Sequence, residues 1–108
     1  MSSSPSFRVE VQPERERVRV VPHGELDLVT VPRLEAQIEA LRSRGFESVA
    51  LDLRQLTFMD STGLRLLLRL QAESRSNGFR FVVIDCEGPV RRLLRLTRID
   101  GQFDYAEE

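Results

Sequence analysis

The sequence predicts a single small α/β domain in which an antiparallel strand pair precedes parallel strands linked by helices, in the order ββαβαβα. Its 108 residues are enough for one domain and too few for two. Apolar residues first alternate with polar ones, as in half-buried strands, and later recur every three or four residues, as in helices. Two nearly continuous apolar runs each follow a helical pattern, which is typical of parallel strands buried on both faces.

The first two strands form the antiparallel pair. Phe7, Val9 and Val11 alternate with polar residues, and the polar segment 13–16 has the composition of a turn. The apolar residues of segment 18–21 then form a second strand that folds back on the first, and we expect this strand to close at His23.

The first helix is predicted from Val31, because apolar residues recur at three- and four-residue spacing as far as Leu41. Thr30 stands where an N-cap is expected, and Pro32 falls in the first turn, where its missing N–H costs nothing. Gly45 ends the helix.

Two buried strands and two further helices complete the predicted order. The apolar runs at 49–53 and 79–84 are the strands, and a short loop leads from the first of them into a leucine-rich helix over 61–77. Asn77 and Gly78 favour a left-handed cap at its end. The last helix begins at Gly88 and Pro89.

Composition excludes several classes of protein. Hydrophobic residues make up 41% and charged residues 31%, and no apolar run approaches the roughly 18 residues that a membrane span requires. The formal charge of −1 provides no overall field to attract nucleic acid or an anionic membrane. All 16 basic residues are Arg, so a Schiff-base lysine and the lysine of a phosphate-binding P-loop are both absent.

The domain limits follow from the ends of the pattern. We expect a flexible N-terminus at 1–6, one folded domain at 7–104 and a C-terminal tail at 105–108. The single cysteine, Cys86, cannot form an internal disulfide, and we expect it to be a small core residue. Since the first residues lack the pattern of a secretory signal, the expected compartment is the cytoplasm.

The segment that leads into the leucine-rich helix is the most informative one. Asp60, Ser61, Thr62 and Gly63 follow a buried strand, and Asp60 or Ser61 can serve as the N-cap. A hydroxyl at a helix start, at the carboxyl end of a parallel sheet, lies where open α/β sheets place their sites and where an anion is tolerated. Ser61 is therefore suited to carry a phosphate. The simpler interpretation is that Ser61 and Thr62 are ordinary capping residues.

Enzymatic interpretations fit the sequence poorly. An aspartic protease has Gly two residues after its Asp, and a serine-hydrolase elbow needs Gly at the position that Met59 occupies. His23 could formally complete a triad with Ser61, but a lone His beside a turn is more often structural. One His and one Cys make no metal site, and we expect no cofactor and no catalysis.

The first turn of the leucine-rich helix, near Leu64 and Arg65, either packs into the core or contacts another protein. The arginines of the last helix are expected to form a solvated face.

Four segments resemble the STAS-domain family, and its branch of bacterial anti-sigma factor antagonists in particular. The resemblance is collinear over nearly the whole chain, and it implies a STAS-like mixed sheet. The segments are Gly24-Glu25-Leu26-Asp27, Leu51-Asp52-Leu53, Phe58-Met59-Asp60-Ser61-Thr62-Gly63-Leu64 and Pro89-Val90-Arg91-Arg92-Leu93-Leu94.

This resemblance implies a partner-switching role. Members bind a cognate anti-sigma factor that is also a serine/threonine kinase and thereby free the sigma factor, and the kinase switches them off by phosphorylating a serine that corresponds to Ser61. We expect a monomer or weak dimer that contacts neither nucleic acid nor membrane. Other branches act without a kinase, in stressosome scaffolds, transporters and lipid-transport complexes. The implied partner-binding residues are Asp27, Asp60, Ser61, Thr62, Gly63, Leu64 and Arg65.

The chain departs from the family pattern at two positions. Arg65 stands where the family often has a small residue after Gly-Leu, on the polar face of the helix and beside the implied contact surface. Arg98, in Thr97-Arg98-Ile99-Asp100, stands where the family has a glycine in a turn.

Overall fold

The computed structural model describes residues 7–84 and 88–106, and it confirms the predicted α/β class and the order of the predicted elements, with one additional strand. The expectations for residues 1–6, for Cys86 and for residues 107–108 lie outside the described residues. The elements are β1 (Arg8–Pro13), β2 (Val18–Leu26), α1 (Val31–Ser43), β3 (Ser48–Asp52), β4 (Leu56–Met59), α2 (Ser61–Ser76), β5 (Arg80–Ile84), α3 (Pro89–Leu96) and the short 3₁₀ helix η1 (Asp100–Gln102).

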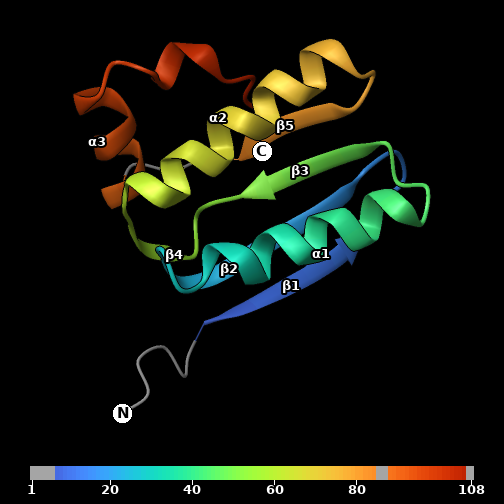
Figure 1. Ribbon diagram of the computed structural model, residues 1–108, viewed down its shortest axis with the longest axis horizontal. Helices are drawn as coiled ribbons and strands as arrows, with labels where there is room; N and C mark the ends of the chain where they lie inside the picture. The colour runs from blue at the N-terminus through green and yellow to red at the C-terminus, as the bar shows by residue number, and fades with distance from the viewer. Residues whose placement is uncertain (1–6, 85–87, 107–108) are drawn as a thin grey trace.

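The sheet is mixed, with the order β1-β2-β3-β5 (Figure 1). Strand β1 pairs antiparallel with β2, whereas β3 pairs parallel with both β2 and β5. Two different strands pair with the same edge of β2, each along a different part of its length. Its first half, Val18 to Val20, pairs with β3, and its second half, Gly24 to Leu26, pairs parallel with β4.

Two expectations about this region are corrected. Strand β2 continues beyond His23 as far as Leu26, and the segment expected to be a short loop before α2 contains β4. Pro22 and Gly24 weaken the strand pattern in the sequence. The sheet accommodates the glycine at φ +107°, next to a register shift between Gly24 and Glu25. Strand β4 has only four residues, which is too few to show a clear alternation.

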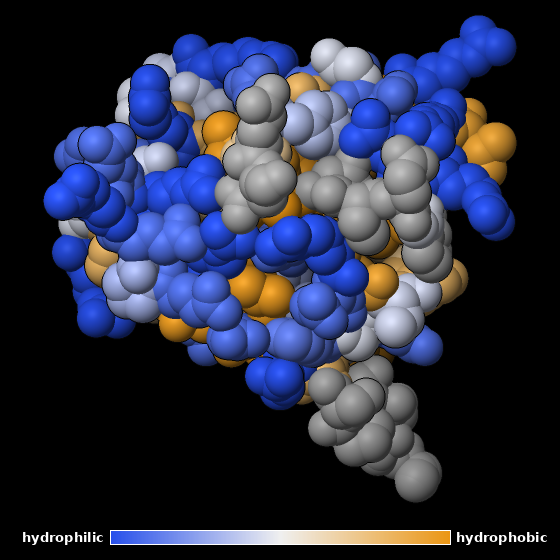
Figure 2. All heavy atoms as spheres, turned by 180° about the vertical axis from the view of Figure 1, so that it is seen from behind, coloured by the Kyte–Doolittle hydropathy of each residue, from blue (hydrophilic) through white to orange (hydrophobic). Residues whose placement is uncertain are grey.

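The hydrophobic core lies between the sheet and the helices α1 and α2, which cover the same face (Figure 1). Valines and leucines of β2 and β3, such as Val18, Val20, Val49 and Leu51, are fully buried there. Helix α1 contributes its apolar stripe, as the periodicity predicts, and the fully buried Leu66 and Leu67 come from α2. In the view from the opposite side, hydrophilic side chains cover most of the surface and the hydrophobic patches are small (Figure 2).

A buried carboxylate fixes the connection between β3 and β4. Asp52 is 4% exposed, and its Oδ1 accepts hydrogen bonds from the backbone N–H and the Nε of Arg54, at 3.1 and 2.9 Å. Its Oδ2 accepts from Nη2 of Arg54 at 2.8 Å and from Nη1 of Arg19 at 3.2 Å. Burial raises the pKa of the Asp52 carboxyl, but the bonds from these two arginines lower it by more, so its pKa lies below the ordinary 3.8. The ionised Asp52 therefore holds the chain that enters β4.

Residues 104–106 pack beside β5. The buried Gln71 of α2 donates to the Asp104 carboxylate and accepts from the Asp104 N–H, both at 3.2 Å. Tyr105, in the segment expected to be a tail, forms a parallel bridge with Val83, and the Ala106 N–H donates to the Val83 carbonyl. Within the described residues, every helix is too short or too polar to serve as a membrane span.

Arg98 is strained. It follows α3 and is the one non-glycine residue with positive φ, 61°, among those described. A side chain in this left-handed region costs roughly 1 kcal/mol or more, and glycine avoids the cost. The departure from the family pattern at Arg98 thus has a structural consequence.

We predict that Arg98→Gly raises the free energy of unfolding by about 0.5 to 1 kcal/mol, because relief of the strain exceeds the added flexibility of the unfolded chain. Arg98→Ala removes the same exposed side chain but keeps a Cβ, so it should leave stability nearly unchanged. Urea unfolding of the three proteins measures both effects. Equal stabilisation by glycine and alanine would show that the side chain, and not the backbone, is responsible.

Candidate functional site

The implied site residues gather where two parallel strands end side by side. Glu25 and Leu26 of β2 pair with Phe58 and Met59 of β4, and the Asp60 N–H donates to the Leu26 carbonyl at 3.2 Å. The loop after β2 and the first turn of α2 therefore emerge at the same end of the sheet (Figure 1). This is the carboxyl end of the strands, where open α/β sheets carry their sites.

Asp60 is the N-cap of α2. Its backbone is extended, and its Oδ1 accepts hydrogen bonds from the N–H groups of Thr62, at 2.9 Å, and Gly63, at 3.2 Å. Two of the N–H groups that a helix start leaves without a partner are thereby satisfied. Of the two capping residues that the sequence allows, the structure selects Asp60, so Ser61 is not used as the cap.

Ser61 is the first residue of α2, and it is exposed. Its Oγ accepts a hydrogen bond from Nη2 of Arg65, one turn further along the helix, at 3.4 Å. Arg65 is also exposed, whereas Thr62 and Leu64 are half-buried and Leu64 packs against the core. The Ser61 hydroxyl is thus open to solvent on a backbone that the Asp60 cap holds in place.

Gly63 brings the helix close to the sheet. It is buried, and a Cβ at this position would lie 2.7 Å from Cγ of Met59 and 3.1 Å from Cγ and Cδ2 of Leu26. Real Cβ atoms essentially never show the first of these distances, so any residue larger than glycine would have to displace the Met59 side chain or move α2 away from β2 and β4. Contact of Gly63 with a partner stays a prediction, and its structural role is to set the position of Ser61.

The loop after β2 is held by Asp27 and Thr30. Asp27 Oδ1 accepts from the N–H groups of Val29 and Thr30, at 3.0 and 3.1 Å. Thr30 stands at the N-cap position of α1 as expected, but its side chain makes no capping bond. Its buried hydroxyl donates instead to the Glu25 carbonyl at 2.7 Å and accepts from the Asp27 N–H at 2.9 Å. These hydrogen bonds link the start of the loop to its end.

Three exposed apolar side chains come from the loop after β2 and from β4, the two segments that meet at this end of the sheet, and sequence reasoning missed them. Leu28 and Val29, in the Asp27 loop, are 72% and 64% exposed, and Phe58 of β4 is 47% exposed. Large apolar side chains that stay in water beside a polar site are typical of an interaction surface. A signal was present in the sequence, because Leu28 and Val29 lie outside any strand or helix period. We call Leu28, Val29, Phe58, Ser61 and Arg65 the Ser61 face.

The residues considered for catalysis are not assembled. His23 Nε2 lies 2.9 Å from Glu10 Oε1 on β1, and this bond lowers the pKa of Glu10 below its ordinary value. Since the Ser61 hydroxyl is contacted by Arg65, the contacts of the described residues do not form a Ser-His-Asp triad. No group of three or more potential metal ligands occurs in the part of the chain that the structure describes.

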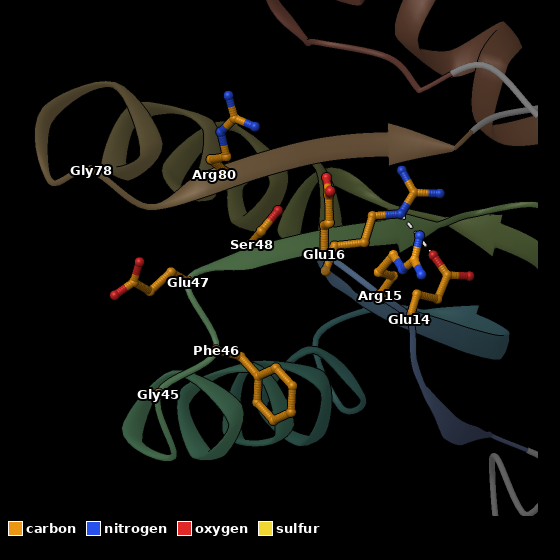
Figure 3. A pocket seen from close by; sticks show the side chains of 10 residues that line it. Glu14, Arg15, Glu16, Gly45, Phe46, Glu47, Ser48, Gly78 and Arg80 are labelled. Atoms are coloured by element: carbon orange, nitrogen blue, oxygen red, sulfur yellow. Dashed lines mark hydrogen bonds and ion pairs between the residues drawn. The ribbon is translucent and has the colours of Figure 1, made fainter.

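A cavity of about 530 Å³ lies at the other end of the sheet, where β3 and β5 begin (Figure 3). Its walls come from the β1–β2 turn and from the segments that follow α1 and α2, and they mix acidic and basic side chains. Arg17 and Glu14 pair with each other there at 2.8 Å. This cavity contains none of the residues that the sequence implicates.

Comparison with known proteins supports the fold. The family model described as "Mlab, STAS domain" matches residues 9–104. The anti-sigma F factor antagonist of Paenibacillus polymyxa is 33% identical over 93 residues, which are 85% of this chain and 80% of that protein. The crystal structure of an anti-sigma factor antagonist from Mycobacterium paratuberculosis has a TM-score of 0.81 at 29% identity, covering 99% of this chain and 92% of that one.

A third similar protein is known in a modified state. The structure of the Bacillus cell fate determinant SpoIIAA in the phosphorylated form has a TM-score of 0.67 at 25% identity, and the match covers 95% of this chain and 93% of that one. The fold defines a small α/β module of the STAS class, and the implied residues meet at one end of its sheet. The chain belongs to the STAS-domain family.

We predict that Gly63→Ala destabilises the domain by about 1 kcal/mol, because the clash with Met59 and Leu26 outweighs the better helix propensity of alanine. Gly101→Ala is the matched control, since a Cβ there meets nothing within 4 Å. Thermal or urea unfolding compares the two variants. A Gly63→Ala protein at least as stable as the parent would contradict the close approach of α2 to the sheet.

Proposed function

We propose that this protein is an anti-sigma factor antagonist that binds its cognate anti-sigma factor through the Ser61 face, and that phosphorylation of Ser61 abolishes this binding. The observation that carries the proposal is the exposed Ser61 hydroxyl on a capped helix start, at the end of the sheet where the segments that carry the exposed Leu28, Val29 and Phe58 also lie. Asp27 and Asp60 hold the two loops, while Thr62, Gly63 and Leu64 complete the first turn.

The names of similar proteins support this role. Two of them, from Paenibacillus polymyxa and Mycobacterium paratuberculosis, are called anti-sigma factor antagonists. A third, SpoIIAA of Bacillus, has been solved in a phosphorylated form. A kinase partner adds the modification by transferring the γ-phosphoryl group of ATP to Ser61 Oγ. ADP leaves, and a base of the kinase takes the hydroxyl proton.

Electrostatics make the modification an effective switch. The phosphate adds roughly 1.5 to 2 negative charges at pH 7, directly beside the Asp60 carboxylate. An interface that fits a neutral hydroxyl and apolar side chains would have to desolvate this dianion without a partner charge. A loss of only about 4 kcal/mol reduces affinity a thousandfold, and desolvation of an unpaired charge exceeds that readily.

The same modification leaves the fold intact, because it adds to a side chain that is exposed and outside the core. A negative charge at a helix N-terminus is tolerated or mildly favourable. The switch therefore acts on association and not on folding. In this proposal the chain is a substrate and a binding partner, and the catalytic groups belong to the kinase.

We predict that Ser61→Glu lowers affinity for the anti-sigma factor at least a hundredfold while the melting temperature changes by no more than about 2 °C. Ser61→Ala should bind like the parent and resist phosphorylation. Ser76→Glu places the same charge on an exposed position at the other end of α2, and it should bind normally. Isothermal titration calorimetry and thermal unfolding give the two readouts.

Incubation with ATP and the anti-sigma factor, followed by mass spectrometry, separates this function from the alternative. Phosphate on Ser61 supports the switch. The phosphorylation switch is wrong if two results are found together. An anti-sigma factor preparation with demonstrated kinase activity leaves Ser61 unmodified, and Ser61→Glu still binds the anti-sigma factor. The alternative is then a STAS module that binds its partner constitutively, as a scaffold or an accessory subunit.

We also predict that Leu28→Ser weakens binding of the anti-sigma factor about tenfold or more, because it removes a large exposed apolar side chain from the proposed interface. Leu96→Ser is the matched control, since Leu96 on α3 is 74% exposed, close to the 72% of Leu28, and does not belong to the Ser61 face. Both side chains lie largely in solvent, so neither change should lower stability. Equal affinities for the two variants would exclude the Asp27 loop from the interface.

A further inference from the structure

Arg65 combines two properties that the proposed function leaves unexplained. Its guanidinium donates from Nη2 to the Ser61 hydroxyl at 3.4 Å, and it takes part in no ion pair among the described residues. Arg69, one turn further along α2, is paired with Glu35 of α1. An arginine that lies over a hydroxyl with its charge uncompensated is arranged to meet an anion at that hydroxyl.

The start of α2 offers a phosphate fewer hydrogen-bond donors than a helix N-terminus usually does. The N–H groups of Thr62 and Gly63 already donate to Asp60 Oδ1, so they are not available to a phosphate on Ser61. The Leu64 N–H donates to the Asp60 carbonyl. The Asp60 carboxylate also repels a second anion. A phosphoryl group on Ser61 therefore needs a cationic donor from elsewhere, and Arg65 is the side chain that already contacts the Ser61 oxygen.

We propose that Arg65 is the phosphate-holding residue of this domain. When Ser61 carries a phosphoryl group, the Arg65 guanidinium pairs with it across one turn of α2. This inference rests on the proposed modification of Ser61, and it explains how a dianion next to Asp60 is accommodated without disturbing the helix start. Because an arginine and an acidic group four residues apart are neighbours on a helix surface, the pair requires no change in the backbone.

Other charged groups lie near this turn, and one of them is Glu25, which is exposed on β2 and pairs in register with Phe58 of β4. Asp27 uses its Oδ1 within its own loop, and Glu35, on the helix packed against α2, is paired with Arg69. Strand β4 has no charged residue. On α3, Arg92 and Arg95 line a separate cavity of about 420 Å³. Asp60 is the chain neighbour of Ser61 and Arg65 contacts its hydroxyl, so the charges of these two groups act most directly on a phosphate at Ser61.

The experiment measures the second pKa of phosphoserine at position 61 by ³¹P NMR titration. Phosphoserine is incorporated during synthesis of the full chain, so no kinase is needed. The nearby cation favours the dianion, so the phosphate pKa should be lower in the parent than in Arg65→Gln by about 0.2 to 0.4 pH unit. Arg69→Gln removes one positive charge from the same helix and should leave the phosphate pKa unchanged.

Arg65→Lys keeps the positive charge, so its phosphate pKa should lie at least halfway from the Arg65→Gln value back to the parent value. The proposal is overturned if the phosphate pKa of the parent and of Arg65→Gln agree within 0.1 pH unit, or if Arg69→Gln shifts it as much as Arg65→Gln does. Since the phosphate is installed without a kinase, this result is independent of whether the anti-sigma factor phosphorylates Ser61. Failure of the Arg65 inference and failure of the proposed function are therefore distinguishable.

Discussion

The carboxylate of Asp60 holds together the part of the molecule on which function depends. The Asp60 backbone N–H donates to the Leu26 carbonyl at the end of β2, and its side-chain Oδ1 accepts hydrogen bonds from the N–H groups of the second and third residues of α2. The same residue thus joins the sheet to the helix. Gly63 complements it by allowing the helix to start in contact with Leu26 and Met59. Together they fix the backbone of Ser61 while leaving its side chain in solvent.

This division between a fixed backbone and an exposed hydroxyl suits a switch that acts on binding alone. The apolar contacts of Leu28, Val29 and Phe58 can provide affinity, because they are exposed in the free domain and lose water on association. The Ser61 hydroxyl contributes little while it is neutral and opposes binding once it carries a phosphate. Arg65 then pairs with the added charge on the surface of α2, and the domain stays folded in both states because Ser61 lies outside the core.

The sequence predicts the fold through its strong periodicities and identifies Ser61 through its place before the leucine-rich helix. It misses β4, because four residues with two exposed side chains carry too little pattern, and it shortens β2 because Pro22 and Gly24 disfavour strands. Leu28 and Val29 stand outside any strand or helix period, which is a weak signal in the sequence, and only the structure shows that they and Phe58 are exposed. For the same reason the contact between Arg65 and Ser61 is visible only in the structure, since an exposed arginine on a polar helix face has no distinctive pattern.

The central claim is that partner docking occurs at the end of the sheet where β2 and β4 terminate. Hydrogen–deuterium exchange of the complex with the anti-sigma factor tests it most directly. The account predicts that amide exchange slows at residues 27–29 and 58–65 in the complex, and that the chain phosphorylated on Ser61 shows no such slowing. Slower exchange at 14–17 and 45–48, beside the cavity at the opposite end, with 27–29 unaffected, would contradict it.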